Sequence, residues 1–268
     1  MDGIADYRFI RQLGEAGYGT MFLAVPPPRL HVPSGHVGVK VLRCANDDAS
    51  LRRATRELRA FAAVSSAYLV KLLDAGRQDS SFFYAMEYCA GGSLAAPEHP
   101  LGRQDILRAV AQAARATHAL NEAGLVHRGI KPSNILLAAD GARLADLGLV
   151  QSLNPGQTVT GLGTMSSVEY LEPMLLSGNP AARTSDVWAL GVTLHRALSG
   201  EGVYGEMPTS DPLLCVRRVL SSPPRMSSRL PDDAARIIAR CVEPDPADRP
   251  QTALEFAESL EPLFQQPD

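Results

Sequence analysis

The stretch His127-Arg128-Gly129-Ile130-Lys131-Pro132-Ser133-Asn134 is the most informative part of the 268-residue sequence, and Asp146-Leu147-Gly148 follows it closely. Asn134 and Asp146 carry oxygen atoms of the kind that Mg²⁺ prefers, together with phosphates and water. The residues between them fit a loop, a short hairpin and a second loop, which would bring both side chains to one edge. The two segments therefore predict a magnesium site.

The composition limits the classes of protein to which this chain can belong. Apolar residues make up 45% and charged residues 21%, so the chain is long enough for one large domain or two lobes. The formal net charge of −3 predicts no nucleic-acid-binding surface. The 4 cysteines are scattered without a C-x-x-C pair, which argues against a zinc site and favours a cytoplasmic location. No apolar run is long enough for a membrane span.

The first third of the chain consists of short β-rich runs that are broken by Gly and Pro. We expect an α+β protein with two lobes, residues 1–90 and 91–268, because the strand-rich part is followed by a helical part. The expected strands of the first lobe are Tyr7–Leu13, Thr20–Val25, Val37–Leu42, Leu69–Gly76 and Phe82–Tyr88, with a helix at Ser50–Val64.

The remainder of the chain shows helical periodicity. Gly124 suits the end of the first of these helices, and Thr184 or Ser185 could cap the second. We expect helices at residues 104–122, 184–198, 211–220, 232–242 and 251–262, and a small hairpin formed by Ile135–Leu137 and Arg143–Ala145.

The first stretch quoted above resembles the catalytic loop of protein kinases, whose pattern is H-R-D-x-K-x-x-N, and further motifs follow the order of that family. Gly129 stands where the family has an Asp that accepts the proton of the substrate hydroxyl. The resemblance covers almost the whole chain and is greatest with bacterial Hanks-type Ser/Thr kinases. It implies that Lys131 neutralises charge on the transferred phosphate, and that Asn134 and Asp146 bind Mg²⁺.

A glycine-rich stretch, residues 13–19, lies between two predicted strands. It resembles the kinase loop that covers the ATP phosphates, where glycine lets backbone amides approach phosphate oxygens. The residues expected to contact the phosphates are Gly14, Ala16, Gly17 and Gly19. Ala16 occupies the position of the second glycine of the pattern, and Met21 that of its usual Val. An ordinary glycine-rich hairpin turn remains the alternative.

Val37-Gly38-Val39-Lys40 resembles the strand that carries the phosphate-anchoring lysine of kinases. Glu57, in the following helix, would be the ion-pair partner of Lys40. The alternative is that Lys40 is an ordinary charged residue on an edge strand and that Glu57 is a solvated residue of the helix. Lysine occurs only at positions 40, 71 and 131, and two of the three match phosphate-binding positions of the family.

The segment Met86–Ser93 resembles the kinase hinge, with Met86 at the gatekeeper position. The resemblance implies that the adenine of ATP hydrogen-bonds to the backbone of Glu87 and Cys89. The predicted cofactors are therefore ATP and Mg²⁺, and the predicted partners are proteins, either as substrates or as regulated targets. The sequence does not predict the oligomeric state.

Two later motifs contain residues that we expect to stabilise the structure of the second lobe. At the end of the expected activation segment, Met174 replaces the family Glu that pairs with an arginine, here Arg249. We expect Glu172 to supply this carboxylate, and Asp186 to be the buried Asp that braces the catalytic loop. The candidate phosphorylation sites, whose usual phosphate partner would be Arg128, are Thr158, Thr160, Thr164, Ser166 and Ser167.

Three functions remain open from the sequence. The first is a pseudokinase that binds nucleotide and signals through a protein partner, because Gly129 has no side chain that could accept a proton. The second is a slow, or deliberately inactivated, Ser/Thr protein kinase. The third is a structural relic that binds no nucleotide.

Overall fold

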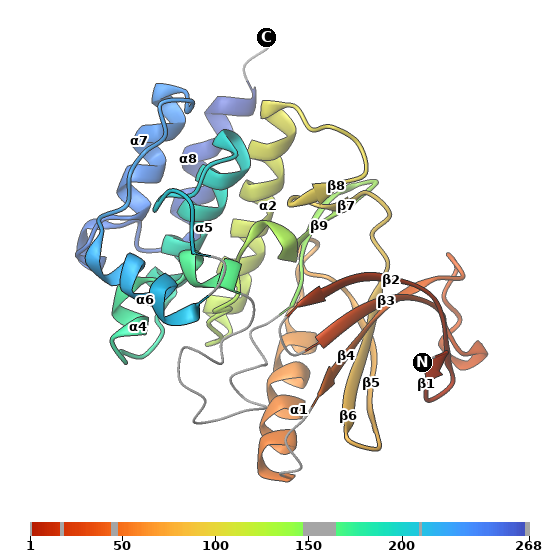
Figure 1. The fold of residues 1–268 in the computed structure, drawn as a ribbon. Coiled ribbons are helices and arrows are strands. Elements are labelled where there is room, and N and C mark those ends of the chain that lie inside the picture. Colours follow the sequence, from red (N-terminus) through yellow and green to blue (C-terminus); the bar gives the residue numbers. More distant parts are fainter. Residues whose placement is uncertain (1, 17–18, 44–47, 147–164, 209–210, 266–268) are drawn as a thin grey trace. The chain divides into compact units, whose positions relative to one another are not determined.

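The computed structural model describes residues 2–16, 19–43, 48–146, 165–208 and 211–265. Among these, the chain divides into two compact units, the first within Met1–Ala63 and Val70–Cys89, the second within Val64–Leu69, Ala90–Gly148 and Met165–Asp268. Figure 1 shows that the first unit is rich in strands and that the second is mostly helical. The expected α+β architecture with two lobes is confirmed.

The first unit is built on an antiparallel six-stranded sheet with the strand order β1-β2-β3-β4-β6-β5. Its strands are β1 (Gly3–Ile4), β2 (Tyr7–Ala16), β3 (Gly19–Val25), β4 (Val37–Arg43), β5 (Leu72–Gln78) and β6 (Ser81–Glu87). All five expected strands are present, and β1 adds an edge strand beside β2.

Period-two alternation separates the two faces of this sheet. On β4, Val37 and Val39 are buried in an apolar cluster that also contains Phe83 of β6. Gly38 and Lys40, which alternate with these valines, therefore belong to the opposite face.

Helix α1 (Asp48–Ala63) is the α-helix of the first unit among the described residues. Its buried residues Ala54, Leu58 and Phe61 recur at four- and three-residue steps, which gives the helix one apolar stripe. The expected helix at residues 50–64 is confirmed.

The second unit is organised around helix α5. Its α-helices are α2 (Arg103–Glu122), α4 (Pro173–Leu176), α5 (Arg183–Ser199), α6 (Pro212–Ser221), α7 (Asp232–Cys241) and α8 (Ala253–Gln265). Helix α2 packs against α5 and α8, and α5 also packs against α7. Trp188 and Val192 of α5 are fully buried in an apolar cluster with Cys215 and Val219 of α6.

A small sheet with the order β10-β9-β7-β8 carries the loops of the second unit. It consists of β7 (Gly92–Ser93), β8 (Ala96–Pro97), β9 (Ile135–Ala138) and β10 (Gly141–Leu144). Gly141 opens β10 with a φ of +136°, a conformation that favours glycine. The expected hairpin is confirmed, and it places Asn134 directly before β9 and Asp146 shortly after β10.

The beginning of α5 differs from our expectation. Ala182 is the N-cap residue, and its backbone N–H donates a 3.1 Å hydrogen bond to the hydroxyl of Ser185 in the first turn. The prediction that Thr184 or Ser185 is the N-cap was therefore wrong, because the hydroxyl of Ser185 acts from inside the helix. At the end of α2, Gly124 has a φ of +78° and the expected helix stop is confirmed.

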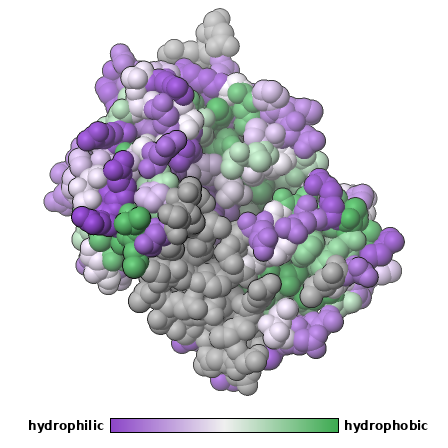
Figure 2. Space-filling model, in the orientation of Figure 1, coloured by the Kyte–Doolittle hydropathy of each residue, from purple (hydrophilic) through white to green (hydrophobic). Residues whose placement is uncertain are grey.

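The surface of the second unit is mostly hydrophilic in the view of Figure 2, with a small hydrophobic patch over α4 and α6. The exposed large hydrophobic side chains of these two helices are Met174, Leu213, Leu214 and Leu220. No helix in the described ranges is both long enough and apolar enough to span a bilayer.

Candidate active site

The β2–β3 hairpin carries the glycine-rich stretch, of which Gly17 lies outside the described residues. β2 ends at Ala16, which pairs with Gly19 at the start of β3. A Cβ atom at Gly19 would lie 2.5 Å from Cδ2 of Leu42 and 2.9 Å from the carbonyl oxygen of Val41, so the surrounding packing requires glycine there. At Gly14 a Cβ atom would meet no protein atom within 4 Å. The space beside Gly14 is therefore open to a ligand.

Lys40 lies on β4, opposite Met21 of β3 and Tyr84 of β6. Only 6% of Lys40 is exposed, and a buried ammonium group needs a polar or negative partner because its desolvation is costly. Glu57 lies half-buried on α1 of the same unit. The ion pair between Lys40 and Glu57 stays a prediction.

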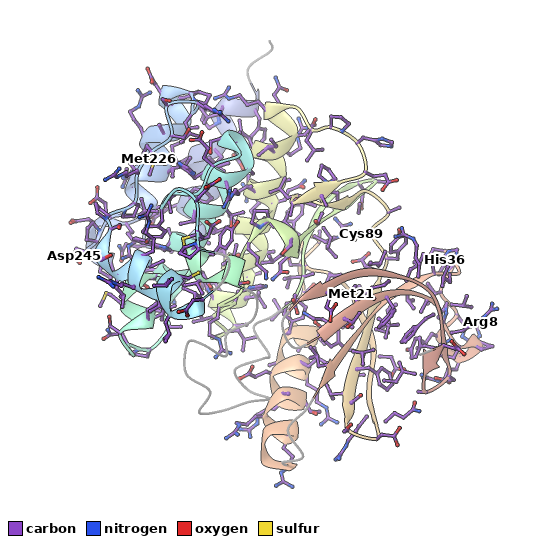
Figure 3. The ribbon with its side chains drawn as sticks, in the orientation of Figure 1. Arg8, Met21, His36, Cys89, Met226 and Asp245 are labelled. Atoms are coloured by element: carbon purple, nitrogen blue, oxygen red, sulfur yellow. The ribbon has the colours of Figure 1, made fainter. Side chains whose placement is uncertain are left out.

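The predicted hinge residues lie at the end of β6 and just beyond it. Met86 is 1% and Cys89 7% exposed, and Figure 3 marks Cys89 after the end of β6. The N–H of Glu87 donates to the carbonyl oxygen of Lys71 at 2.9 Å, and the Glu87 carboxylate accepts from the N–H of Lys71 at 2.8 Å. These two bonds fix the backbone of Glu87 at the position where we expect adenine.

Asp186, in the first turn of α5, organises the loop that precedes Gly129. One carboxylate oxygen accepts from the N–H of His127 at 2.9 Å and from Nδ2 of Asn121 at 3.0 Å, and the other accepts from the N–H of Arg128 at 3.0 Å. Asp186 is only 1% exposed, and hydrogen bonds to a buried carboxylate are stronger than those between neutral groups. The expected bracing role of Asp186 is confirmed.

Two further hydrogen bonds frame Gly129 itself. Nδ2 of Asn134 donates to the carbonyl oxygen of Gly129 at 2.7 Å, and the N–H of Gly129 donates to Nδ1 of His127 at 3.3 Å. The loop therefore has a defined backbone shape, although a hydrogen atom stands where the family has a carboxylate.

Asn134 and Asp146 are brought to the same part of the second unit. The N–H of Ala145 donates to the carbonyl oxygen of Asn134 at 2.8 Å, which ties Asn134 to the residue before Asp146. Asp146 has a φ of +67°, in the left-handed region that non-glycine residues adopt at a cost and that is enriched at functional sites. Because Nδ2 of Asn134 is bonded to Gly129, its Oδ1 is the atom that a cation would use.

In the part of the chain that the structure describes, no three His, Cys, Asp or Glu side chains form a metal site. The oxygen atoms of Asn134 and Asp146 nevertheless suit Mg²⁺, because this ion commonly takes one or two protein oxygens and completes its coordination with phosphates and water. Leu147 and Gly148 of the second predicted motif lie outside the described residues, as do the candidate phosphorylation sites Thr158, Thr160 and Thr164.

Lys131 makes a contact that the sequence did not reveal. Its Nζ donates a 2.8 Å hydrogen bond to Oγ of Ser167. Ser167 was expected only as a candidate phosphorylation site, which stays a prediction, and its hydroxyl holds the ammonium group beside the loop of Gly129. The sequence analysis did not connect these two residues, which lie 36 positions apart.

Two ion pairs, one of them buried on both sides, fix the segment that follows Ser167. Glu172 accepts a 2.6 Å hydrogen bond from Arg249, with both side chains almost fully buried, and the expected pair is confirmed. Glu169 accepts from Nη2 of Arg196 at 2.9 Å and 3.0 Å. This second pair was not predicted. Together they attach the segment to α5 and to the loop before α8.

His127 supports the loop as a neutral ring. It is fully buried, and this burial lowers its pKa because an imidazolium would lose its hydration. Its Nδ1 accepts a hydrogen bond from the N–H of Gly129, which requires that Nδ1 carry no proton. The ring therefore adds no positive charge beside Gly129 at neutral pH.

Comparisons with known proteins agree with this arrangement. The family model described as "Protein kinase domain" matches residues 7–260. The chain is 32% identical over 256 residues to the probable serine/threonine-protein kinase PkwA of Thermomonospora curvata, with 93% of this chain and 33% of that protein covered. It is 28% identical over 268 residues to the serine/threonine-protein kinase PrkC of Bacillus subtilis, with 96% and 40% covered. The chain thus spans 33% to 40% of the length of these relatives.

Among solved structures, the kinase domain of Mycobacterium tuberculosis PknI, as a Cys-to-Ala mutant, matches with a TM-score of 0.71 and 25% identity. The match covers 98% of both chains. On the family model, the relatives and the fold, the chain belongs to the protein kinase domain family and resembles bacterial Ser/Thr kinases.

Proposed function

We propose that this chain is an ATP-binding protein kinase domain whose phosphotransfer to protein Ser or Thr is abolished or strongly impaired at Gly129, and that it acts as a signalling pseudokinase. The observation that supports this proposal is the set of hydrogen bonds that holds the loop around Gly129. The loop is held by His127, Asn134 and Asp186, yet its central residue offers no proton acceptor. Asp186 cannot replace that acceptor, because three N–H groups already bind its two oxygens.

The residues present fit ATP and Mg²⁺ as ligands. Lys40 supplies a buried ammonium group for phosphate, and Asn134 and Asp146 supply oxygen ligands for the metal ion. In this family the bound nucleotide supplies the phosphoryl group, and the protein positions it and balances its charge. Lys131, oriented by Ser167, would contribute to that balance.

Replacing one general base by glycine lowers a rate about 10²–10⁴-fold, which corresponds to about 3–5 kcal/mol of activation free energy. This loss exceeds what the remaining groups can restore, since Ser133 is not a base near neutral pH. The proposed output is therefore a nucleotide-dependent conformation that a protein partner recognises.

The decisive experiment restores the carboxylate with Gly129→Asp and measures phosphotransfer to the chain itself and to a generic basic protein, together with Mg·ATP binding by thermal shift. We expect both proteins to bind Mg·ATP, and only Gly129→Asp to transfer phosphate at a readily measured rate. Gly129→Asp combined with Asp146→Ala is the control that should lose transfer. Wild-type transfer within tenfold of the Gly129→Asp rate would contradict the pseudokinase proposal.

A slow Ser/Thr kinase is the second candidate, and the 2.8 Å contact between Lys131 and Ser167 favours it, because an ordered lysine beside the loop has a use in phosphotransfer. Radiolabel transfer by the wild-type chain that disappears in Lys131→Ala would support this candidate. Failure of both the wild type and Gly129→Asp to transfer phosphate, while both bind Mg·ATP, would eliminate it.

A further inference from the structure

Helix α1 carries a stripe of arginines on its exposed side. The helix contains four arginines and two acidic residues, so it has a net positive charge. Arg52, Arg56 and Arg59 are exposed. At about 100° per residue, these three positions fall within an arc of about 60°, directly opposite the buried apolar stripe described above. The fourth arginine, Arg53, lies outside this arc. We call Arg52, Arg56 and Arg59 the arginine stripe.

Helices α2 and α5 differ from α1, because each of their arginines has an acidic partner. The ion-paired arginines are Arg103, Arg108 and Arg115 of α2 and Arg183 and Arg196 of α5. The three guanidinium groups of the arginine stripe form no ion pair within the described part of the chain. Figure 3 shows nitrogen-tipped side chains projecting from α1. The positive charge of the stripe is therefore available to a ligand.

The arginine stripe does not stabilise α1 itself. Arg52 and Arg56 are four residues apart, and Arg56 and Arg59 are three residues apart. Like charges at these two spacings are neighbours on a helix surface and repel one another. Glutamine has about the same helix propensity as arginine, so helix formation does not require arginine at these positions. A negatively charged ligand that lies along the stripe would remove the repulsion.

The surroundings of the stripe favour one class of negatively charged ligand. A nucleic acid is disfavoured, because the whole chain has a net charge of −3. A helix that binds a membrane surface also inserts large apolar side chains next to its basic residues. The exposed large hydrophobic side chains of the described residues lie on β2, α4 and α6, and none of them belongs to α1. The remaining class is an acidic segment of a protein.

The spacing of the stripe suits an extended acidic segment. Arg52 and Arg56 are separated by about 6 Å along the helix axis, and the whole stripe spans about 10 Å. In an extended chain, side chains on the same side recur about every 7 Å. The planar fork of a guanidinium group binds a carboxylate through two parallel hydrogen bonds. Acidic residues at alternate positions of an extended segment can therefore each face one arginine of the stripe.

We propose that the arginine stripe of α1 is a docking surface for an extended segment of a partner protein that is rich in Asp and Glu. The proposal goes beyond the proposed function, because the stripe would bind this segment whether or not the chain transfers phosphate. Each guanidinium group donates to a carboxylate of the segment. Because these ion pairs form at the protein surface, salt weakens the complex.

The test is fluorescence anisotropy of the whole chain with a labelled peptide in which Glu and Ser alternate. The triple variant Arg52→Gln/Arg56→Gln/Arg59→Gln should bind this peptide about tenfold more weakly than the wild type, or weaker still, because it loses three charge pairs. Its melting temperature should equal or exceed that of the wild type, since the repulsion within the stripe is gone. The loss of binding is then not caused by unfolding.

The matched control is Arg11→Gln/Arg217→Gln/Arg236→Gln. It removes the same charge from exposed arginines of β2, α6 and α7, which form no stripe. Its affinity for the peptide should stay within about twofold of the wild type, because distant surface charges are screened by salt. For the wild type, raising the NaCl concentration from about 50 to about 300 mM should weaken binding about tenfold.

Hydrogen exchange of the wild-type chain locates the binding site without any substitution. The backbone amides of α1 should exchange more slowly when the peptide is bound. Three results would overturn the proposal: no slowing in α1, equal losses of affinity in the stripe variant and the control variant, or binding of the wild type to phosphatidylserine vesicles but not to the peptide. The equal losses would indicate diffuse charge attraction, and the vesicle result would indicate a membrane surface as the ligand.

Discussion

Arg249 donates a 2.6 Å hydrogen bond to Glu172 in the interior of the second unit, where the two residues are 2% and 3% exposed. Arg249 also donates to the carbonyl oxygen of Glu243 at 2.7 Å and lies 5.0 Å from the ring centre of Trp188. Met174, which occupies the family position of the carboxylate, is 40% exposed. The ion pair is therefore retained, with the acid supplied from two positions earlier.

Glu172→Ala should destabilise the second unit strongly. Removing one partner of a buried ion pair leaves an uncompensated charge, and we expect the free energy of unfolding to fall by about 3–5 kcal/mol. Met174→Ala, at the exposed family position, is the matched control and should change it by less than about 0.5 kcal/mol. Urea denaturation of the whole chain measures both changes.

A double-mutant cycle separates the pair from other effects of the substitution. Combining Glu172→Ala with Arg249→Met should give a coupling energy of at least about 1 kcal/mol, because the apolar partner removes the unpaired charge. Additive losses would contradict the structural role that we assign to the pair.

The two described glycines of the β2–β3 hairpin should respond differently to alanine. Gly19→Ala should lower the free energy of unfolding by about 1–3 kcal/mol, because its Cβ atom would overlap Leu42 and the backbone of Val41. Gly14→Ala should leave ligand-free stability within about 0.5 kcal/mol and reduce the thermal shift produced by Mg·ATP. Melting curves with and without Mg·ATP test both expectations. An unchanged ATP shift in Gly14→Ala would show that the space beside Gly14 is not used by the phosphates.

Much of the fold could be predicted because its larger elements have strong periodicity. The alternation of Val37 and Val39 predicts the strand β4, and the helical spacing of apolar residues predicts α2 and α5. The predicted ends of these elements lie within about two residues of the observed ends. β7 and β8 were missed, since strands of 2 residues are too short to show a period. The N-cap of α5 was missed because Ala182 makes its hydrogen bond through its backbone, which no side-chain pattern records.

The candidate site could be predicted in part. Asp186 and the pair of Glu172 and Arg249 followed from family spacing, whereas the bond from Lys131 to Ser167 joins loops without a shared motif.

Asp186→Asn should loosen the loop around Gly129. One carboxylate oxygen becomes an NH₂ group, which cannot accept a hydrogen bond. Because the N–H groups of His127 and Arg128 bind different oxygens of Asp186, one of these two donors loses its acceptor. We expect a loss of about 1–3 kcal/mol in the free energy of unfolding and a smaller thermal shift with Mg·ATP. Asp211→Asn is the control, because Asp211 caps α6 and Asn is an equally good N-cap. Equal effects of the two substitutions would contradict the bracing role.

The stability of the second unit should fall as the pH falls below about 6.5, the pKa of an unperturbed histidine. His195 is buried, its Nε2 accepts from the N–H of Ser227 at 3.1 Å, and its Nδ1 lies 3.0 Å from the carbonyl oxygen of Glu201. This arrangement requires a neutral ring, and burial lowers the pKa of His195, as it does that of His127. The unfolded chain therefore binds protons more readily than the folded chain in this range.

Each such histidine reduces the free energy of unfolding by at most about 1.4 kcal/mol for each pH unit below 6.5, and the reduction stops below the pKa of the folded state. Urea denaturation at pH 8, 7, 6 and 5.5 should give a plateau followed by a decline. His195→Gln, which cannot titrate, should be less stable at pH 8 and should show a shallower decline, with the remaining slope due to His127 and to carboxylates. A wild-type profile that is flat or rises toward pH 5.5 would mean that these rings bind a proton in the folded protein at least as readily as in the unfolded chain. The hydrogen bonds from Ser227 to His195 and from Gly129 to His127 do not allow this.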